Sequence, residues 1–294
     1  MYLGIEIGGT KLQLALGPGD GTLVGLWRTR VDPASRAPGI RDAIEAGVPA
    51  LLATAGVPRD HLRGVGVGFG GPVDLATRSV VKSHQVTGWD GFALGEWCEA
   101  TIGVPAVVAN DAAAAGLAEA LFGAGRGVSP LFYVTAGSGV GGALVIDGDI
   151  YTGAGRGAAE VGHLPATVGG ETATVEAFAS GWAIARRAGM ASGEDAAAAA
   201  RRGEPRAKAA VAAAVEALAA GLTQVILLVC PRRVVVGGGV GLMGDDLLFD
   251  PLRAAVAGRT FPPFAGLTDI VPAALGEAVV PHGALALAAR RFGG

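Results

Sequence analysis

The stretch GIEIGGTKLQLAL, residues 4–16, decides how the rest of the sequence is interpreted. Two short apolar runs flank the turn Gly8-Gly9-Thr10-Lys11, which predicts two strands joined by a tight hairpin. Glycines let backbone N–H groups approach an anion, Thr10 adds a hydroxyl donor and Lys11 adds a cation. The turn therefore predicts one half of a nucleotide-phosphate site, although a plain hairpin turn would carry the same two glycines.

A second stretch, PLFYVTAGSGVGGALVID at residues 130–147, repeats this pattern of strand, glycine turn with a hydroxyl, and strand. Its turn contains Gly137, Ser138 and Gly139. With Gly142 these glycines match a dinucleotide-binding fingerprint, but that fingerprint must open a helix, and here a strand follows. Two such turns, one in each half of the chain, instead predict a clamp that holds a polyphosphate from both sides.

Polar side chains that suit a sugar-hydroxyl site follow these turns. Asn110-Asp111 stands where a predicted strand ends and a helix begins, which fits both a helix N-cap and a general base. The sequences AAEVGH and TVEAFASG supply Glu160, His163 and Glu176. Carboxylates accept hydrogen bonds from hydroxyls, and a site built from them rejects analogues that lack those hydroxyls. Beside a phosphate clamp, these groups predict a sugar pocket.

The pattern of apolar residues predicts a mixed α/β chain of two related halves. We expect an N-terminal domain over 1–112 and a larger C-terminal domain over 113–281, with a C-terminal helix near 282–294 packing back on the first domain. A third glycine cluster, VVVGGGVG, ends a predicted strand and could let an adenine lie against bare backbone. Further strands are expected at 64–69 and 105–110, and further helices at 38–55, after 110, at 173–188 and at 282–291.

The bulk composition excludes several classes of protein. The chain has 294 residues, 17% of them charged, and a net charge of -3 without a basic stripe, which argues against a nucleic-acid partner. Cys98 and Cys230 make neither a disulfide framework nor a four-cysteine zinc site. No signal-peptide pattern opens the sequence, so we expect a cytoplasmic protein. Residues 211–230 are apolar enough to span a membrane, but Glu216 and Gln224 within them favour a buried core helix.

These motifs, together with GFGGPVD, GWDG, VVANDAAAAGLAEALFGAG and VEAFASG, resemble those of the ROK family of sugar kinases and repressors. They stand in the family order and cover most of the chain. The resemblance implies a two-domain actin-like ATPase (ribonuclease H-like) fold with a central cleft. It also implies an ATP-dependent kinase that transfers the γ-phosphate to a sugar hydroxyl, with ATP and Mg²⁺ as cofactors.

The resemblance also implies a role for individual residues. Asp111 would be the base that deprotonates the sugar hydroxyl. The sugar's other contacts would come from Gly71, Gln85, Asn110, Glu160, His163 and Glu176. The phosphates of ATP would be held by Gly8, Gly9, Thr10, Lys11, Gly137, Ser138 and Gly139. Gly238 and Gly239 would lie beside the adenosine.

The sequence departs from the family pattern at four places. Glu6 replaces the usual aspartate near Mg²⁺, and its longer carboxylate would reach the metal directly or through water. Gly70-Gly71 replaces Pro-Gly, and Gln85 replaces an asparagine, which leaves the identity of the sugar open. The segment LPATVGGETATV, residues 164–175, contains no cysteine, so the zinc site of many family members is not expected and His163 is left to the sugar.

We expect the 6-hydroxyl of glucose as the acceptor, with N-acetylmannosamine, N-acetylglucosamine, fructose, mannose or a glycoside as alternatives. A repressor of the same family is a rival, but only three residues precede Gly4, so we expect no helix-turn-helix module. A sugar-sensing protein without catalysis is a second rival, against which Asn110-Asp111 argues. We further expect a homodimer and no membrane partner.

Overall fold

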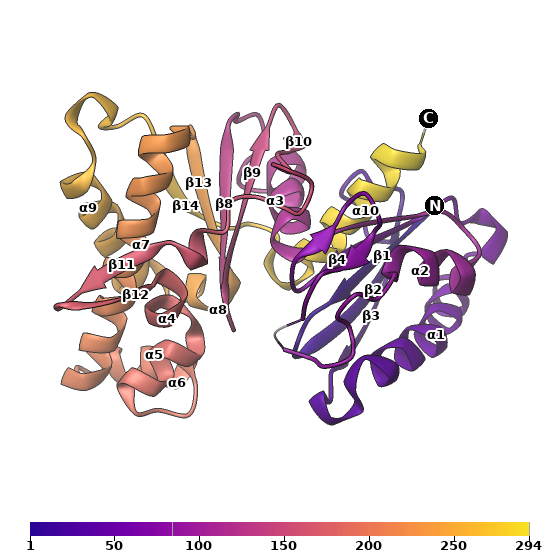
Figure 1. Ribbon diagram of the computed structural model, residues 1–294, viewed down its shortest axis with the longest axis horizontal. Helices are drawn as coiled ribbons and strands as arrows, with labels where there is room; N and C mark the ends of the chain where they lie inside the picture. The colour runs from indigo at the N-terminus through magenta and orange to yellow at the C-terminus, as the bar shows by residue number, and fades with distance from the viewer. Residues whose placement is uncertain (84, 294) are drawn as a thin grey trace. The chain divides into compact units, whose positions relative to one another are not determined.

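The structure, a computed structural model, describes residues 1–83 and 85–293. The chain forms two compact α/β units (Figure 1). The first unit comprises Met1–Phe122, Ile150–Ala158 and Glu277–Gly294, and the second comprises Gly123–Asp149 and Ala159–Gly276. The first unit thus runs past residue 112 to the end of a helix, and it also takes in a short segment from the middle of the chain.

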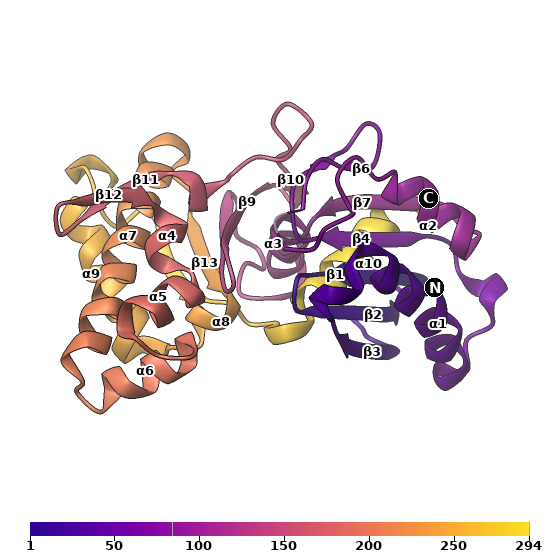
Figure 2. The ribbon, with the colours of Figure 1, turned by 60° about the horizontal axis from the view of Figure 1, so that its bottom comes forward.

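The first unit is built on a five-stranded sheet in the order β3-β2-β1-β4-β7 (Figure 2). Its strands are β1 (Tyr2–Ile7), β2 (Lys11–Gly17), β3 (Gly25–Arg30), β4 (Val65–Phe69) and β7 (Ala106–Asn110). Strands β1, β4 and β7 are parallel, and the register pairs Ile7 with Phe69 and Phe69 with Asn110. The carboxyl ends of these three strands therefore meet at one edge of the sheet, where the predicted site residues follow them.

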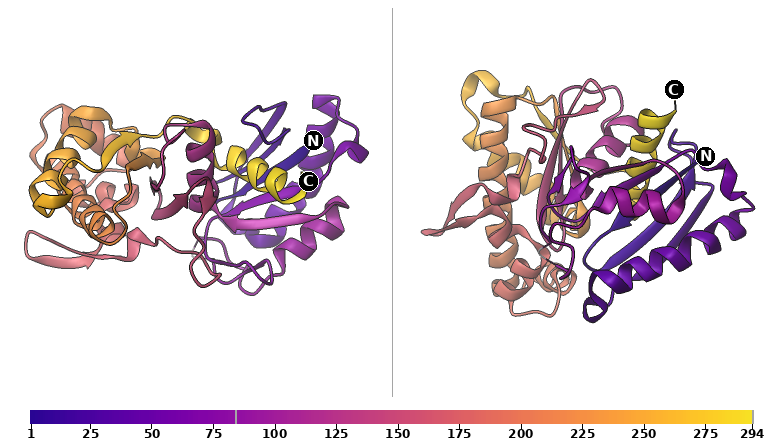
Figure 3. Two further views of the ribbon diagram at one scale, coloured as in Figure 1. Left: turned by 90° about the horizontal axis from the view of Figure 1, so that it is seen from above. Right: turned by 45° about the vertical axis from the view of Figure 1, so that its right-hand side comes forward.

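Helices cover both faces of this sheet (Figure 3). They are α1 (Arg36–Ala55), α2 (Leu94–Ile102), α3 (Asp111–Phe122) and α10 (Val279–Phe292), with the short turns η1 (Pro33–Ser35), η2 (Arg59–His61) and η6 (Gly276–Ala278) and the small hairpin β5 (Val73–Asp74) and β6 (Ser79–Val80). Alternate residues of β1 face opposite sides. Leu3 and Ile5 join the core cluster that includes Ile44 of α1, whereas Gly4 faces α10.

Helix α10 packs against β1, β4 and α3 at unusually short range. A Cβ atom at Gly4 would lie 2.9 Å from the carbonyl oxygen of Pro281, and one at Gly66 would overlap the carbonyl oxygen of Ala284. The glycines that alternate with apolar residues in β1 and β4 are therefore on the face that receives the last helix. Large side chains there would hold the helix away from the sheet.

The second unit has its own five-stranded sheet in the order β10-β9-β8-β13-β14. Its strands are β8 (Leu131–Ala136), β9 (Val140–Ile146), β10 (Asp149–Ile150), β13 (Arg233–Gly237) and β14 (Asp269–Pro272), beside a separate hairpin of β11 (Pro165–Val168) and β12 (Glu171–Thr174). Its helices are α4 (Val175–Ala179), α5 (Gly181–Ala188), α6 (Gly193–Arg201), α7 (Pro205–Val229), α8 (Gly238–Gly241) and α9 (Asp250–Arg259), with the turns η3 (Val161–His163), η4 (Asp245–Phe249) and η5 (Pro262–Phe264). Strand β9 confirms that the fingerprint-like glycines are followed by a strand.

Helix α7 is the centre of the second core. By length and composition alone it could cross a membrane, but 56% of its most apolar window is buried inside the structure. It packs against α4, α5, α6 and α9, and its Val211, Leu218 and Leu222 belong to the same core cluster as Val234 of β13. The prediction of a buried core helix is therefore confirmed.

The single helix expected over 173–188 is wrong. The chain first completes β12 and then forms two helices, α4 and α5, because Ser180 between them is extended with ψ 152°. The hydroxyl of Ser180 donates to the carbonyl oxygen of Glu176, and the next amide, that of Gly181, donates to the carbonyl oxygen of Gly137 at 2.7 Å. The helix is thus broken by a contact with the second glycine turn.

Candidate functional site

The first glycine turn lies at the sheet edge of the first unit. The strands on either side of it form the predicted hairpin, and the Gly8 amide donates to the Lys11 carbonyl oxygen at 3.0 Å. The Gly70 amide, which follows β4, donates to the Ile7 carbonyl oxygen at 2.9 Å. This bond holds the Gly70-Gly71 turn against the first glycine turn.

Asn110 and Asp111 follow β7 at the same edge. The side-chain oxygen of Asn110 accepts hydrogen bonds from the first amides of α3, and its amide group donates to the Gly71 carbonyl oxygen at 3.1 Å. Asn110 therefore caps the helix and fixes the Gly71 turn. Asp111 Oδ1 accepts from the Ala112 amide at 2.8 Å, while a Cβ atom at Gly70 would lie 3.5 Å from Asp111 Oδ2. Glycine at position 70 thus keeps a side chain from contacting this carboxylate.

A buried polar cluster lies behind the first turn. Glu6 is only 4% exposed, and its carboxylate contacts Lys11 Nζ at 3.3 Å and accepts a short hydrogen bond from Gln13 Nε2. Both donors also reach the Glu277 carbonyl oxygen, at 3.2 and 2.8 Å. Burial raises the pKa of Glu6 above its usual value, and the nearby Lys11 charge and the Gln13 hydrogen bond oppose that rise. Gln13 was not predicted, although a lone amide within the apolar strand KLQLALG was a usable signal.

Gln85 lies against the first glycine turn. It lines a small pocket with residues of the turns and of the loop before α2, namely Ile7, Gly8, Gly9, Phe69, Gly70, Ser83, Val86 and Trp89. Trp89 is fully buried, and among residues 1–83 and 85–293 its indole N–H has no hydrogen-bond partner. The pocket therefore places the Gln85 amide beside the turn, with Trp89 among the residues that line it.

In the second unit the structure brings the second and third glycine clusters together. The Gly137 amide donates to the Gly139 carbonyl oxygen at 2.8 Å, which closes the turn after β8. Gly238 has φ +80° and lies so close to Ala136 that a side chain would overlap its carbonyl group. Only glycine fits that backbone and that spacing. A Cβ atom at Gly137 would lie 3.9 Å from the Gly239 amide nitrogen.

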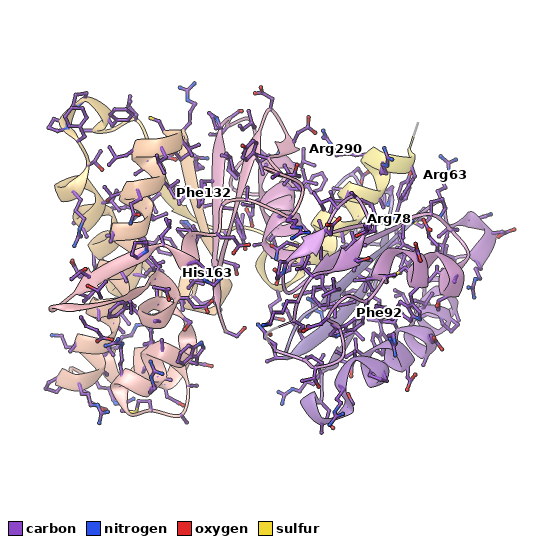
Figure 4. The ribbon with its side chains drawn as sticks, in the orientation of Figure 1. Arg63, Arg78, Phe92, Phe132, His163 and Arg290 are labelled. Carbon is purple, nitrogen blue, oxygen red and sulfur yellow. The ribbon has the colours of Figure 1, made fainter. Side chains whose placement is uncertain are left out.

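Glu160 directly precedes the turn η3, and His163 is its last residue. The turn packs on β9. Both residues are exposed, and the His163 amide donates to the Glu160 carbonyl oxygen at 3.1 Å. Figure 4 labels His163. The preceding Ala159 has φ +67°, a backbone conformation that is costly for a residue with a side chain. Gly162 fits so closely against the Val140 carbonyl group that a side chain there would overlap it. The turn therefore lies directly beside the residue that follows the second glycine turn.

Glu176 contacts that same residue. Its Oε2 accepts a hydrogen bond from the Val140 amide at 2.8 Å. The sequence predicted Glu176 as a sugar ligand and contained no sign of this contact beside the second glycine turn. The second unit thus gathers the glycine turn of 137–139, the Gly238-Gly239 pair, Glu176 and the turn that carries Glu160 and His163.

The two cysteines are remote from this chemistry. Cys98 is buried in the first core, and burial raises the pKa of its thiol to about 12, so it is not a reactive thiolate. Cys230 ends α7 with φ +47°. Across the part of the chain that the structure describes, no three His, Cys, Asp or Glu side chains gather where they could hold a metal ion.

The two α/β units, each with a glycine turn at the end of the first strand of its sheet, have the actin-like ATPase fold. The sequence model of the ROK family matches residues 2–291, and the chain belongs to this family. A structure of a ROK family glucokinase from Streptomyces griseus in complex with glucose and AMPPNP aligns with a TM-score of 0.84 and 29% identity, over 98% of this chain and 99% of that one.

Curated relatives extend over most of the chain. The glucokinase of Thermotoga maritima is 30% identical over 99% of this chain and 98% of its own length. The N-acetylmannosamine kinase of Escherichia coli is 34% identical over 82% of this chain and 83% of its own length. With such relatives, the chain has the activity of an ATP-dependent sugar kinase.

Proposed function

We propose that the protein transfers the γ-phosphate of ATP to the 6-hydroxyl of glucose, with Asp111 as the general base. The observation that carries this proposal is the position of Asp111. Its carboxylate stands at the sheet edge where β1, β4 and β7 end, next to the Gly70 turn, and that turn is hydrogen-bonded to the end of β1. Two of the similar proteins named above are glucokinases, which supports glucose as the acceptor.

Phosphoryl transfer depends mostly on positioning and on electrostatic stabilisation. We propose that Asp111 orients the sugar hydroxyl and takes its proton as the phosphoryl group arrives. The amides of Gly8 and Gly9, with Thr10, would hold phosphate oxygens in the first unit, and Lys11 would offset their charge. In the second unit Gly137, Ser138 and Gly139 would hold phosphate, and Gly238 and Gly239 would lie beside the adenosine.

The residues around Glu6 fit Mg²⁺ only through water. Glu6 is buried, and its oxygens already contact Lys11 and Gln13. Mg²⁺ usually keeps several waters and binds one or two carboxylates plus substrate phosphates. When bound, the ion would neutralise charge that develops on the phosphates, while Glu6 would orient its water and keep Lys11 in place.

Sugar recognition would come from hydrogen-bonding groups. We assign it to Gly71, Gln85, Asn110, Glu160, His163 and Glu176. N-acetylmannosamine is the second candidate acceptor, because the relative with that substrate in its name is 34% identical. Gln85 also supports a sugar other than glucose, because it replaces the shorter asparagine that the family usually has at this position.

The test is ADP release with a panel of hexoses, comparing the wild-type enzyme with Asp111→Asn. Asparagine keeps the shape and can still accept from the Ala112 amide, so the fold and sugar binding should persist. We expect kcat to fall by at least about 10²-fold, the usual scale for loss of a general base. Near-normal turnover by the variant would show that another group takes the proton. A wild-type preference for N-acetylmannosamine would replace glucose by the second candidate.

A further inference from the structure

We propose that Glu176 is a positioning residue for the nucleotide-phosphate turn, holding residues 137–140 in the shape that receives phosphate. This rests on the proposed role of the turn in binding ATP. It is a second role, separate from the sugar contact assigned to Glu176 above, and it acts on the other substrate. The assignment comes from the bond between the Glu176 carboxylate and the Val140 amide.

That bond fixes the exit of the turn. Val140 is the first residue of β9 and pairs with Ala136, the last residue of β8. The amide of Val140 points to Glu176 Oε2 at 2.8 Å, and hydrogen bonds to an ionised group are stronger than those between neutral groups. The other end of the turn is held as well, since the Gly137 carbonyl oxygen accepts from the Gly181 amide at 2.7 Å.

Both anchors come from one corner of the chain, the junction of α4 and α5. Glu176 lies in the first turn of α4, whose N-cap Thr174 accepts from the Ala177 amide at 3.2 Å. Ser180 ends that helix and donates to the Glu176 carbonyl oxygen at 2.8 Å. Val175 and Phe178 are fully buried, so the short helix is fixed in the core. The junction of α4 and α5 thus holds both ends of the phosphate turn in place.

Glycine at position 139 makes room for the carboxylate. A Cβ atom at Gly139 would lie 2.7 Å from Glu176 Oε2, closer than two such atoms pack. The absence of a side chain at this position therefore serves two purposes. It opens the backbone toward phosphate, and it lets Glu176 reach the next amide.

The charge of Glu176 separates this role from sugar binding. A carboxylate beside phosphate is repelled, so the useful property here is its oxygen acceptor rather than its charge. Glutamine keeps an acceptor oxygen at the same reach, and alanine has none. For the nucleotide we therefore expect Glu176→Gln to behave like the wild-type protein and Glu176→Ala to fail.

The experiment is calorimetric titration of the full chain with AMPPNP and Mg²⁺ in the absence of sugar. Loss of a hydrogen bond to a charged group should weaken binding by about tenfold or more in Glu176→Ala, whereas Glu176→Gln should stay within about threefold. Glu171→Ala is the matched control. It removes an exposed carboxylate that pairs with Arg187 at 2.8 Å in the same unit, and it should leave AMPPNP binding unchanged.

Gly139→Ala gives a second route to the same loss. Its methyl group should displace the Glu176 carboxylate from the Val140 amide. In the Glu176→Ala background the same change should reduce AMPPNP affinity much less than in the wild type, because the hydrogen bond is already absent. Thermal melting curves check that each variant is folded. Wild-type affinity for AMPPNP in folded Glu176→Ala would overturn the proposal, as would a Glu176→Gln variant that binds AMPPNP as poorly as Glu176→Ala.

The result can be separated from the proposed function. If no hexose is phosphorylated while Glu176→Ala still loses AMPPNP selectively, the acceptor assignment fails and the positioning role stands. If hexoses are phosphorylated and Glu176→Ala changes only the KM for sugar, the positioning role fails and the kinase assignment stands.

Discussion

Gln85 lies across Gly9 so closely that a methyl group at residue 9 would overlap the side-chain amide of Gln85. Both residues line the same small pocket of the first unit. A side chain proposed to read the sugar therefore touches a turn proposed to hold phosphate. Asparagine, one methylene shorter, would withdraw from Gly9 and uncover the turn.

We predict that Gln85→Asn changes the order in which hexoses are preferred. The shorter amide moves its donor and acceptor away from their present place without removing them, so hydroxyls that matched glutamine should no longer match. The measurement is kcat/KM for each hexose at saturating ATP. Glu160→Gln is the companion variant, and there we expect KM for sugar to rise far more than KM for ATP. An unchanged hexose ranking with a raised KM for ATP would make Gln85 a support of the phosphate turn.

The raised pKa of Glu6 predicts a pH-dependent cost in stability. Because burial favours the protonated form, Glu6 contributes stability that is fully present below the ordinary glutamate value of 4.5 and is lost as the pH rises through its value in the folded protein. Glu6→Gln cannot ionise. The free energy of unfolding of the wild-type protein should therefore fall relative to that of the variant as the pH increases above 4.5. Urea unfolding at several pH values measures this difference, and a difference that grows in the opposite direction would show that Lys11 outweighs burial.

His282 in α10 should give stability the opposite dependence on pH to that of Glu6. The ring contacts Phe122 and is half-buried, its Nδ1 has no partner among the described residues, and Glu119 is the charged group that faces it. Burial lowers the pKa of His282, while Glu119 opposes that shift. Stability from the neutral ring should be present above the ordinary histidine value of 6.5 and lost as the pH falls through the folded value. In urea unfolding, His282→Gln should reduce the loss of unfolding free energy that occurs as the pH falls. An unchanged dependence on pH would exclude His282 as the source of that loss.

Much of the first unit could be predicted because its signals are local. The apolar runs around Gly8-Gly9 give a hairpin, and Asn110-Asp111 marks the end of a strand and the start of a helix. Parallel strands then bring Gly70 and Asp111 to one edge. The alternation of glycine with apolar residues was also visible, but its cause lies in α10, more than two hundred residues away in the sequence.

The contacts that could not be predicted join distant segments. Gln13 Nε2 donates to the carbonyl oxygen of Glu277, and Glu176 bonds Val140 across 36 positions. No periodicity or short motif specifies such a pair. The break at Ser180 is a similar case, because the Gly181 amide there bonds to the distant carbonyl oxygen of Gly137.

The packing of α10 on β1 and β4 sets an order for folding during synthesis. The ribosome makes β1 first, yet the glycine face of β1 and β4 is covered only when residues 279–292 have emerged. All the segments of the second unit lie between these two points of the chain. The first unit can therefore cover this face of its sheet only after every segment of the second unit has been synthesised.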